Sequence, residues 1–245
     1  MNLQSIINSI TLQPPMLKKV VPCCGAAAFG LYRLLFATGV DGRGLLKSGH
    51  FSWVLLCILS IAVGAVILAS TAELPQGDSR FRRSVPAAVC CALAAVSVLL
   101  TGFGCLWNGQ LIYVVGAMLA AAAFAAVMLC RFLGRRPNFL MHAVICVHFL
   151  LQLLKLYQEN SFDPQIQDYL FQVLTCIALA FTAYQLAMAD LNRGSRRWLW
   201  VSGMSAVYLC ILTLGSSANG LSLTGAAWAF TTLMIPMRKR EKAEN

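Results

Sequence analysis

The segment HAVICVH contains two histidines and a cysteine, the residue types that most often bind transition metals. His142 and Cys146 are four residues apart and share one helix face, whereas His148 lies about 120° from His142 at 100° per residue. Two ligands and no nearby carboxylate make a poor metal site. We therefore predict no bound metal, and we expect these histidines to be hydrogen-bonded packing residues between helices.

A second polar stripe follows in the same segment, because His148, Gln152 and Lys155 recur at helical spacing on one face. The next apolar segment carries Asp168 and Gln172 near its beginning. The connecting stretch YQENSFDPQIQ makes the two segments an antiparallel hairpin, so we expect the two stripes to meet near the outer surface. Interhelical hydrogen bonds with a Lys155–Asp168 ion pair explain the pattern, and a ligand pocket is the alternative.

An arginine within the first apolar segment, GLYRLLFATGV, is the third candidate. A charge near the middle of a spanning helix costs about 2.5 to 3.5 kcal/mol on insertion scales, and less when the side chain reaches the interface. Arg33 lies about 10 Å before Val40 at 1.5 Å per residue, which is a long way to the outer surface. Ala26, Gly30 and Ala37 lie on its side of the helix. We therefore predict that Arg33 faces the other helices.

The polar partner of Arg33 is expected to be a carbonyl or a carboxylate such as Asp41 or Asp168. Two functions remain open. In the first, an outward-facing pocket binds a small anionic solute, in a permease or a solute-binding subunit; the candidate pocket residues are Arg33, Tyr32, His148, Gln152, Lys155 and Gln172. In the second, the protein is a scaffold, sensor subunit or membrane protein partner whose buried polar groups only fix packing. Convergence of the six side chains on one cavity would favour the solute-binding function.

Other chemistry finds little support in the sequence. The serine hydrolase, zinc protease and nucleotide-binding motifs GxSxG, HExxH and Walker A do not occur. The ten cysteines form two vicinal pairs and six singles without a CxxC spacing, which is typical of small apolar residues in membrane helices. None of the nine Asp and Glu residues lies centrally in an expected helix, so the carboxylate relay of a proton-coupled carrier is missing. We expect no catalytic residues and no cofactor.

The composition requires a membrane setting for these residues. Apolar residues make up 59% of the chain and charged residues only 11%, too few to cover a soluble domain of 245 residues. The charges are also clustered, which leaves long uncharged intervals. We predict an all-α bundle of eight transmembrane helices, at residues 20–40, 51–71, 84–103, 111–130, 139–156, 167–189, 198–215 and 218–236.

The distribution of the 19 Lys and Arg residues predicts the orientation of the bundle. Only Arg43, Lys47 and Lys155 fall on the outer side if the N-terminus is inside, and Arg33 lies within the first helix. The other basic residues lie at cytoplasmic ends, as the positive-inside rule expects. An even number of helices then places both termini in the cytoplasm. The net charge of +10 is explained by anchoring to anionic lipid, so no nucleic-acid partner is expected.

The expected bundle occupies residues 19–237 and ends in a basic cytoplasmic tail at 238–245. Residues 1–18 are either a short interfacial helix or an extension caused by a misassigned start, because Met16 opens the plausible beginning MLKKVV. Within the bundle, small residues recur at four-residue spacing and indicate close helix packing. Examples are the pairs Ala26 with Gly30, Ser60 with Gly64, and Gly225 with Ala229.

The connector ATGVDGRGLLKSGH follows the first helix. It resembles the corresponding stretch of a group of multi-spanning membrane proteins of anaerobic clostridia that have no known function. The resemblance covers about the first quarter of the chain and carries no catalytic motif. It implies a multi-pass protein of the bacterial cytoplasmic membrane.

The predicted orientation is testable by cysteine accessibility in intact cells. A new cysteine at Asn160 should react with an impermeant thiol reagent added outside, because this position follows the fifth predicted helix on the outer side. A new cysteine at Ser79 should stay unmodified until the cells are permeabilised. Modification of Ser79→Cys from outside would reverse the orientation.

Overall fold

The computed structural model describes residues 14–39, 50–72, 83–107, 110–160, 169–191, 193–216 and 219–234. This part of the chain is all α-helical and contains no strand. The helices are α2 (Pro14–Thr38), α3 (Phe51–Ala72), α4 (Val85–Trp107), α5 (Leu111–Leu133), α6 (Phe139–Asn160), α7 (Leu170–Asp190), α8 (Arg196–Leu212) and α9 (Asn219–Leu233). The predicted all-α bundle of eight helices is confirmed.

The predicted helix boundaries agree with the structure to within a few residues, except at the beginning of α2. That helix begins at Pro14 rather than at residue 20. Proline is tolerated there because the amide groups of the first helical turn have no intrahelical acceptor. Residues 14–18 therefore belong to the bundle. The expected interfacial segment at 1–13 and the basic tail at 238–245 lie outside the described residues.

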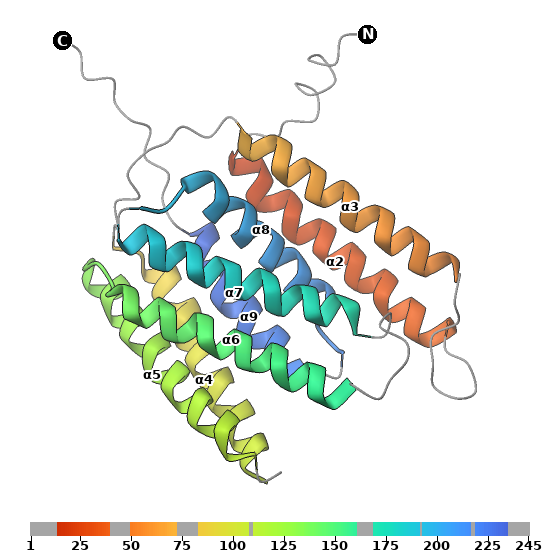
Figure 1. The fold of residues 1–245 in the computed structure, drawn as a ribbon. Helices are drawn as coiled ribbons and strands as arrows, with labels where there is room; N and C mark the ends of the chain where they lie inside the picture. Colours follow the sequence, from red (N-terminus) through yellow and green to blue (C-terminus); the bar gives the residue numbers. More distant parts are fainter. Residues whose placement is uncertain are drawn as a thin grey trace, which may run out of the picture.

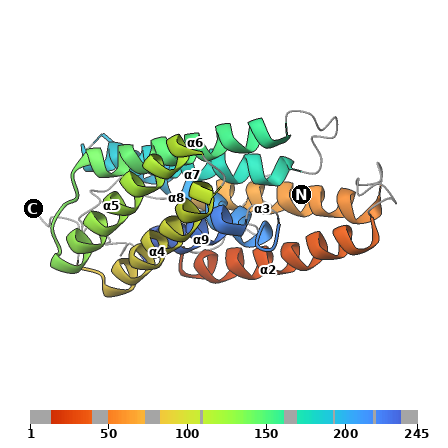
Figure 2. The same ribbon diagram turned by 90° about the horizontal axis from the view of Figure 1, so that it is seen from below.

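Six of the helices form a closed ring, in which each helix packs against its two neighbours. The order around the ring is α4, α5, α6, α7, α8 and α9, and α9 returns to α4. Helices α2 and α3 pack against each other and against α8, outside the ring. Figure 1 shows the result, with α8 and α9 between the α2–α3 pair on one side and α4 with α5 on the other. The view turned by 90° shows the same separation (Figure 2).

Six helices, α2 to α7, are long and apolar enough to cross a membrane. The remaining two are shorter: α8 has 17 residues and α9 has 15, or about 25 Å and 22 Å at 1.5 Å per residue. Most side chains of both short helices are buried, because longer helices surround them. The chain is therefore a multi-pass membrane bundle whose two shortest helices lie inside it.

Close approach of the helices depends on small residues at some of their contacts. A Cβ atom added to Gly203 of α8 would lie 2.9 Å from the Cβ of Thr232 on α9, and one added to Gly102 of α4 would lie 2.8 Å from the Cβ of Ala117 on α5. Gly30 and Gly64, by contrast, would meet no atom within 4 Å. The four-residue spacing of small residues therefore marks a packing face at Gly225, where an added Cβ would lie 2.5 Å from the Leu179 side chain, but outward faces at Gly30 and Gly64.

Substitutions of two glycines distinguish these roles. Gly203→Ala should lower the free energy of unfolding by about 1 to 3 kcal/mol, because the β-branched Thr232 side chain cannot yield easily. Gly64→Ala is the matched control and should be neutral or slightly stabilising, since alanine has the higher helix propensity. Denaturant unfolding of both variants in the same detergent measures the difference. Equal stability of the two variants would contradict the close α8–α9 contact.

Candidate functional site

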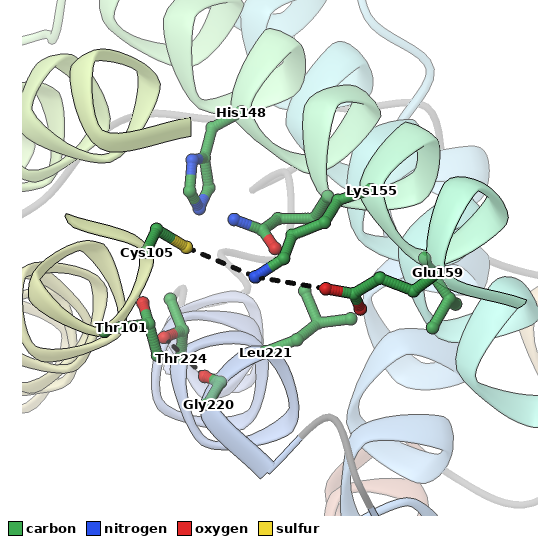
Figure 3. Close-up of a pocket in the computed structure, with 11 residues that line it drawn as sticks. Thr101, Cys105, His148, Lys155, Glu159, Gly220, Leu221 and Thr224 are labelled. Carbon is green, nitrogen blue, oxygen red and sulfur yellow. Dashed lines mark hydrogen bonds and ion pairs between the residues drawn. The ribbon is translucent and has the colours of Figure 1, made fainter. Parts of the chain in front are cut away.

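A cavity of about 290 Å³ lies between α4, α6 and α9. Its lining residues come from these three helices: Thr101, Gly104 and Cys105 from α4; His148, Gln152, Lys155, Leu156 and Glu159 from α6; and Gly220, Leu221 and Thr224 from α9. Figure 3 shows His148 and Lys155 reaching from α6 toward Cys105 on α4, with Gly220 and Thr224 of α9 on the other side.

The short length of α9 explains why the cavity forms at this level. Gly220, in the first turn of α9, lies directly against the side chain of Thr101. From Thr101 onward, α4 continues to Trp107, which is about 9 Å farther at 1.5 Å per residue. Helix α6 also continues, to Asn160. The space between the ends of α4 and α6 is therefore not filled by α9.

Lys155 is the central charged group of the cavity. Its ammonium donates a hydrogen bond to Cys105 Sγ at 3.2 Å and lies 3.7 Å from Glu159 Oε1. The ring centroid of Tyr113 is 6.0 Å away. The Lys155 side chain is 21% exposed, whereas that of Glu159 is 53% exposed. An ion pair with so exposed a partner contributes little and exchanges easily, so the ammonium remains accessible to another anion.

His148 and two threonines complete the polar lining. His148 is buried, and its imidazole contacts the backbone of Gly116 and the ring of Phe149. The Thr224 hydroxyl lies 2.8 Å from Ser97 Oγ, which ties α9 to α4 beside the cavity. Thr101 bonds its own helix at the Val98 carbonyl, 2.9 Å away. The hydroxyl groups are thus held in place by the helices that carry them.

An aromatic cluster lies deeper in the ring than the cavity. Phe124 of α5, Phe149 of α6 and Trp228 of α9 are fully buried, with ring centroids 5.3 to 6.5 Å apart. Phe149 follows His148 in the sequence, and Trp228 is one helical turn beyond Thr224 toward the end of α9. The cluster therefore fills the middle of the ring below the polar lining.

Three of the six residues suggested by the sequence, His148, Gln152 and Lys155, line this cavity together. Gln172 is buried on α7 and does not line it. Near Gln172, the Thr175 hydroxyl lies 3.5 Å from that of Thr213, in the α8–α9 connection. Gln172 therefore does not join His148, Gln152 and Lys155 in the cavity, and the meeting of the two polar stripes stays a prediction. Asp168 lies outside the described residues.

Arg33 and Tyr32 also lie away from the cavity. Tyr32 is buried and packs edge-on against Phe171 of α7, with ring centroids 6.2 Å apart. Arg33 is exposed and donates a hydrogen bond from Nη1 to the carbonyl of Gly215, at 3.1 Å. Gly215 adopts φ of +90°, which a glycine allows at this turn between α8 and α9. The partner of Arg33 is therefore a carbonyl, one of the two kinds expected.

The predicted inward orientation of Arg33 was wrong. Ala26, Gly30 and Ala37 are exposed together with the arginine, and Tyr32 and Leu35 are buried instead. The physical reason is that the large apolar side chains of α2 fill the space against the neighbouring helices. The alternative partner Asp41 lies outside the described residues.

The two possible metal ligands on one face of HAVICVH, His142 and Cys146, have different partners in the structure. His142 Nδ1 lies 2.5 Å from Asp190 Oδ2, whereas Cys146 Sγ donates to the Ala180 carbonyl at 3.3 Å. Among the described residues, no group of three His, Cys, Asp or Glu side chains could hold a metal ion. The expectation of no nearby carboxylate was wrong, however. An antiparallel hairpin places the beginning of α6 beside the end of α7, and this signal could have identified Asp190.

Comparisons of the chain with protein-family models, curated proteins and solved structures return no match. The resemblance of the connector after α2 to clostridial membrane proteins therefore stays a prediction.

The observed place of Arg33 predicts a structural role at the α8–α9 turn. Arg33→Leu should fold normally and lower the free energy of unfolding by about 1 kcal/mol or less, because one partly solvated hydrogen bond is lost. Arg33→Lys should fall between the wild type and Arg33→Leu, since an ammonium can still reach a carbonyl but lacks the guanidinium fork. Denaturant unfolding measures both variants. A loss of more than about 3 kcal/mol would contradict so limited a role.

Proposed function

We propose that this protein binds a small anionic solute in the cavity between α4, α6 and α9, as a permease-like or solute-binding protein of the bacterial cytoplasmic membrane. The observation that carries the proposal is the Lys155 ammonium in a cavity whose one acidic lining residue is the exposed Glu159. The cavity volume of about 290 Å³ is at the lower end of the range for ligand pockets, which suits a small molecule.

The lining supplies groups that recognise an anion. Lys155 provides a mobile positive charge, and the Gln152 amide can donate a hydrogen bond beside it. Helix α9 begins at Asn219, next to the cavity, and the amide groups of a first helical turn favour negative charge. Gly220 has no side chain to cover that turn. A carboxylate or phosphate entering the cavity would replace Glu159 as the partner of Lys155.

Cys105 provides a reporter inside the cavity, because Lys155 donates a hydrogen bond to its sulfur. In a variant that retains only this cysteine, we compare the anionic reagent sulfonatoethyl methanethiosulfonate with its cationic trimethylammonium-ethyl counterpart, both added outside intact cells. The ratio of the two labelling rates cancels the intrinsic reactivity of the thiol. The anionic reagent should react faster, and Lys155→Gln should lower the ratio about tenfold, as expected for loss of roughly 1.4 kcal/mol of charge attraction.

Lys18→Gln is the matched control, since this lysine also lies over an aromatic ring, that of Trp200, but outside the cavity. It should leave the ratio unchanged. Inorganic phosphate or acetate should slow labelling in the wild type and not in Lys155→Gln. Equal rates for the two reagents, or no labelling from outside, would refute the anion site and favour a scaffold or partner role.

A further inference from the structure

A second polar cluster lies at the opposite end of the ring from the cavity. It is formed by Arg131 in the last turn of α5, His142 in the first turn of α6 and Asp190 at the end of α7. Arg131 is 5% exposed, and the side chains of His142 and Asp190 are 1% exposed each. Ionisable groups buried this deeply in a membrane bundle are expensive and mark functional sites more often than packing sites.

The three groups interact in sequence across three helices. His142 Nδ1 and Asp190 Oδ2 are 2.5 Å apart, and Arg131 interacts electrostatically with Asp190. Among the described residues, the titratable groups that face Arg131 from other directions are the thiols of Cys91 on α4 and its neighbour Cys130. Arg131 and an ionised Asp190 balance each other while His142 is neutral. The cluster then has no net charge, as its burial requires.

The hydrogen-bond pattern leaves two acceptors unfilled. A carboxylate only accepts, so in this neutral state the proton between the pair belongs to Nδ1 of His142. Nε2 is then an acceptor. Neither Nε2 of His142 nor Oδ1 of Asp190 has a hydrogen-bond partner within the part of the chain that the structure describes, although both atoms are buried. A buried acceptor without a donor is costly, and the site therefore favours a ligand that brings a proton.

We propose that Arg131, His142 and Asp190 form a proton-binding site at the end of the ring opposite the solute cavity. One proton from the adjacent aqueous phase adds to Nε2 of His142, no covalent bond breaks, and the cluster gains one positive charge. Asp190 stabilises the resulting imidazolium, whereas Arg131 opposes it. Histidine is the side chain whose charge ordinarily changes between pH 5 and 8, which makes it suited to reversible proton binding.

The place of this site within the ring suggests what the proton does there. The solute cavity, the aromatic cluster and the proton site follow one another along α6, at Lys155, Phe149 and His142. A buried cluster that gains a net charge is less stable in its dry surroundings, so protonation favours separation of the ends of α5, α6 and α7. Coupling of this opening to solute movement rests on the proposed function, whereas the proton site itself does not.

The chain is well suited to a direct test, because it contains only three histidines: His50, His142 and His148. In full-length protein labelled with ¹⁵N at histidine and held in lipid nanodiscs, imidazole nitrogen shifts can be followed from pH 8.5 to 4.5. Substitution of each histidine by glutamine assigns the signals. We expect His142 to have a protonated Nδ1 and a bare Nε2 at high pH, and Nε2 to gain a proton as the pH falls.

Two charge-removing variants then test the roles of the partners. Asp190→Asn should lower the titration midpoint of His142 by about one to three pH units, because the nearby negative charge is lost. Arg131→Gln should raise it. The His148 signal is the internal control and should not move in either variant, since His148 lies in the solute cavity. If Asp190→Asn does not fold, the titrations of the wild type and of Arg131→Gln still test whether His142 binds the proton.

Three results would overturn the proton site: His142 neutral throughout the range, His142 fully protonated throughout it, or a wild-type midpoint that persists in the charge-removing variants.

A second measurement tests whether protonation separates the ends of α5, α6 and α7. With Cys91 as the single cysteine, labelling by a small thiol reagent should accelerate at least tenfold between pH 8 and 5, after correction for the reactivity of free cysteine. His142→Gln should abolish this acceleration. The histidine titration and the Cys91 labelling do not depend on the result of the Cys105 experiment. The solute cavity and the proton site can therefore be refuted separately.

Discussion

The structure depends on one constraint, the enclosure of a helix that is too short to cross the bilayer by itself. Helix α9 has 15 residues, about 22 Å, against a hydrocarbon core of about 30 Å. The longer helices α4 and α6 supply the missing length, and α9 contacts α4 so closely that Gly220 lies directly against Thr101. The short helix α9 is thus supported by the longer helices of the ring. These helices enclose a space at the beginning of α9 that α9 itself does not fill.

This arrangement divides the interior of the ring into three levels with different chemistry. At the level where α9 begins, the lining is polar and holds Lys155. At the level of Trp228, three aromatic rings exclude water. At the far end, where α9 terminates, the ends of α5, α6 and α7 bring together Arg131, His142 and Asp190. Helix α6 contributes a residue to every level, because Lys155, Phe149 and His142 follow one another along it.

Much of the helix pattern was predictable from the sequence, because uncharged intervals of spanning length and glycine-rich turns determine it. The polar stripe of α6 was predictable for the same reason, since helical periodicity fixes which side chains share a face. Periodicity does not say which helices are neighbours, so the contact of α6 with the α4–α9 cavity could not be derived. Small residues do not always mark a packing face, and in α2 they lie on the exposed side together with Arg33. In α2, Tyr32 and Leu35 gain more by burial than alanine does.

The two proposed sites have opposite charge requirements. The Lys155 cavity would attract one negative charge, and the His142 site would accept one positive charge. A solute anion crossing with one proton would carry no net charge through the ring, so the membrane potential would neither drive nor oppose the movement. Binding of the anion would also compete for the Lys155 ammonium, whose hydrogen bond to Cys105 connects α6 to α4. Because α6 carries residues of both proposed sites, a displacement of this helix would link solute binding at one end to proton binding at the other.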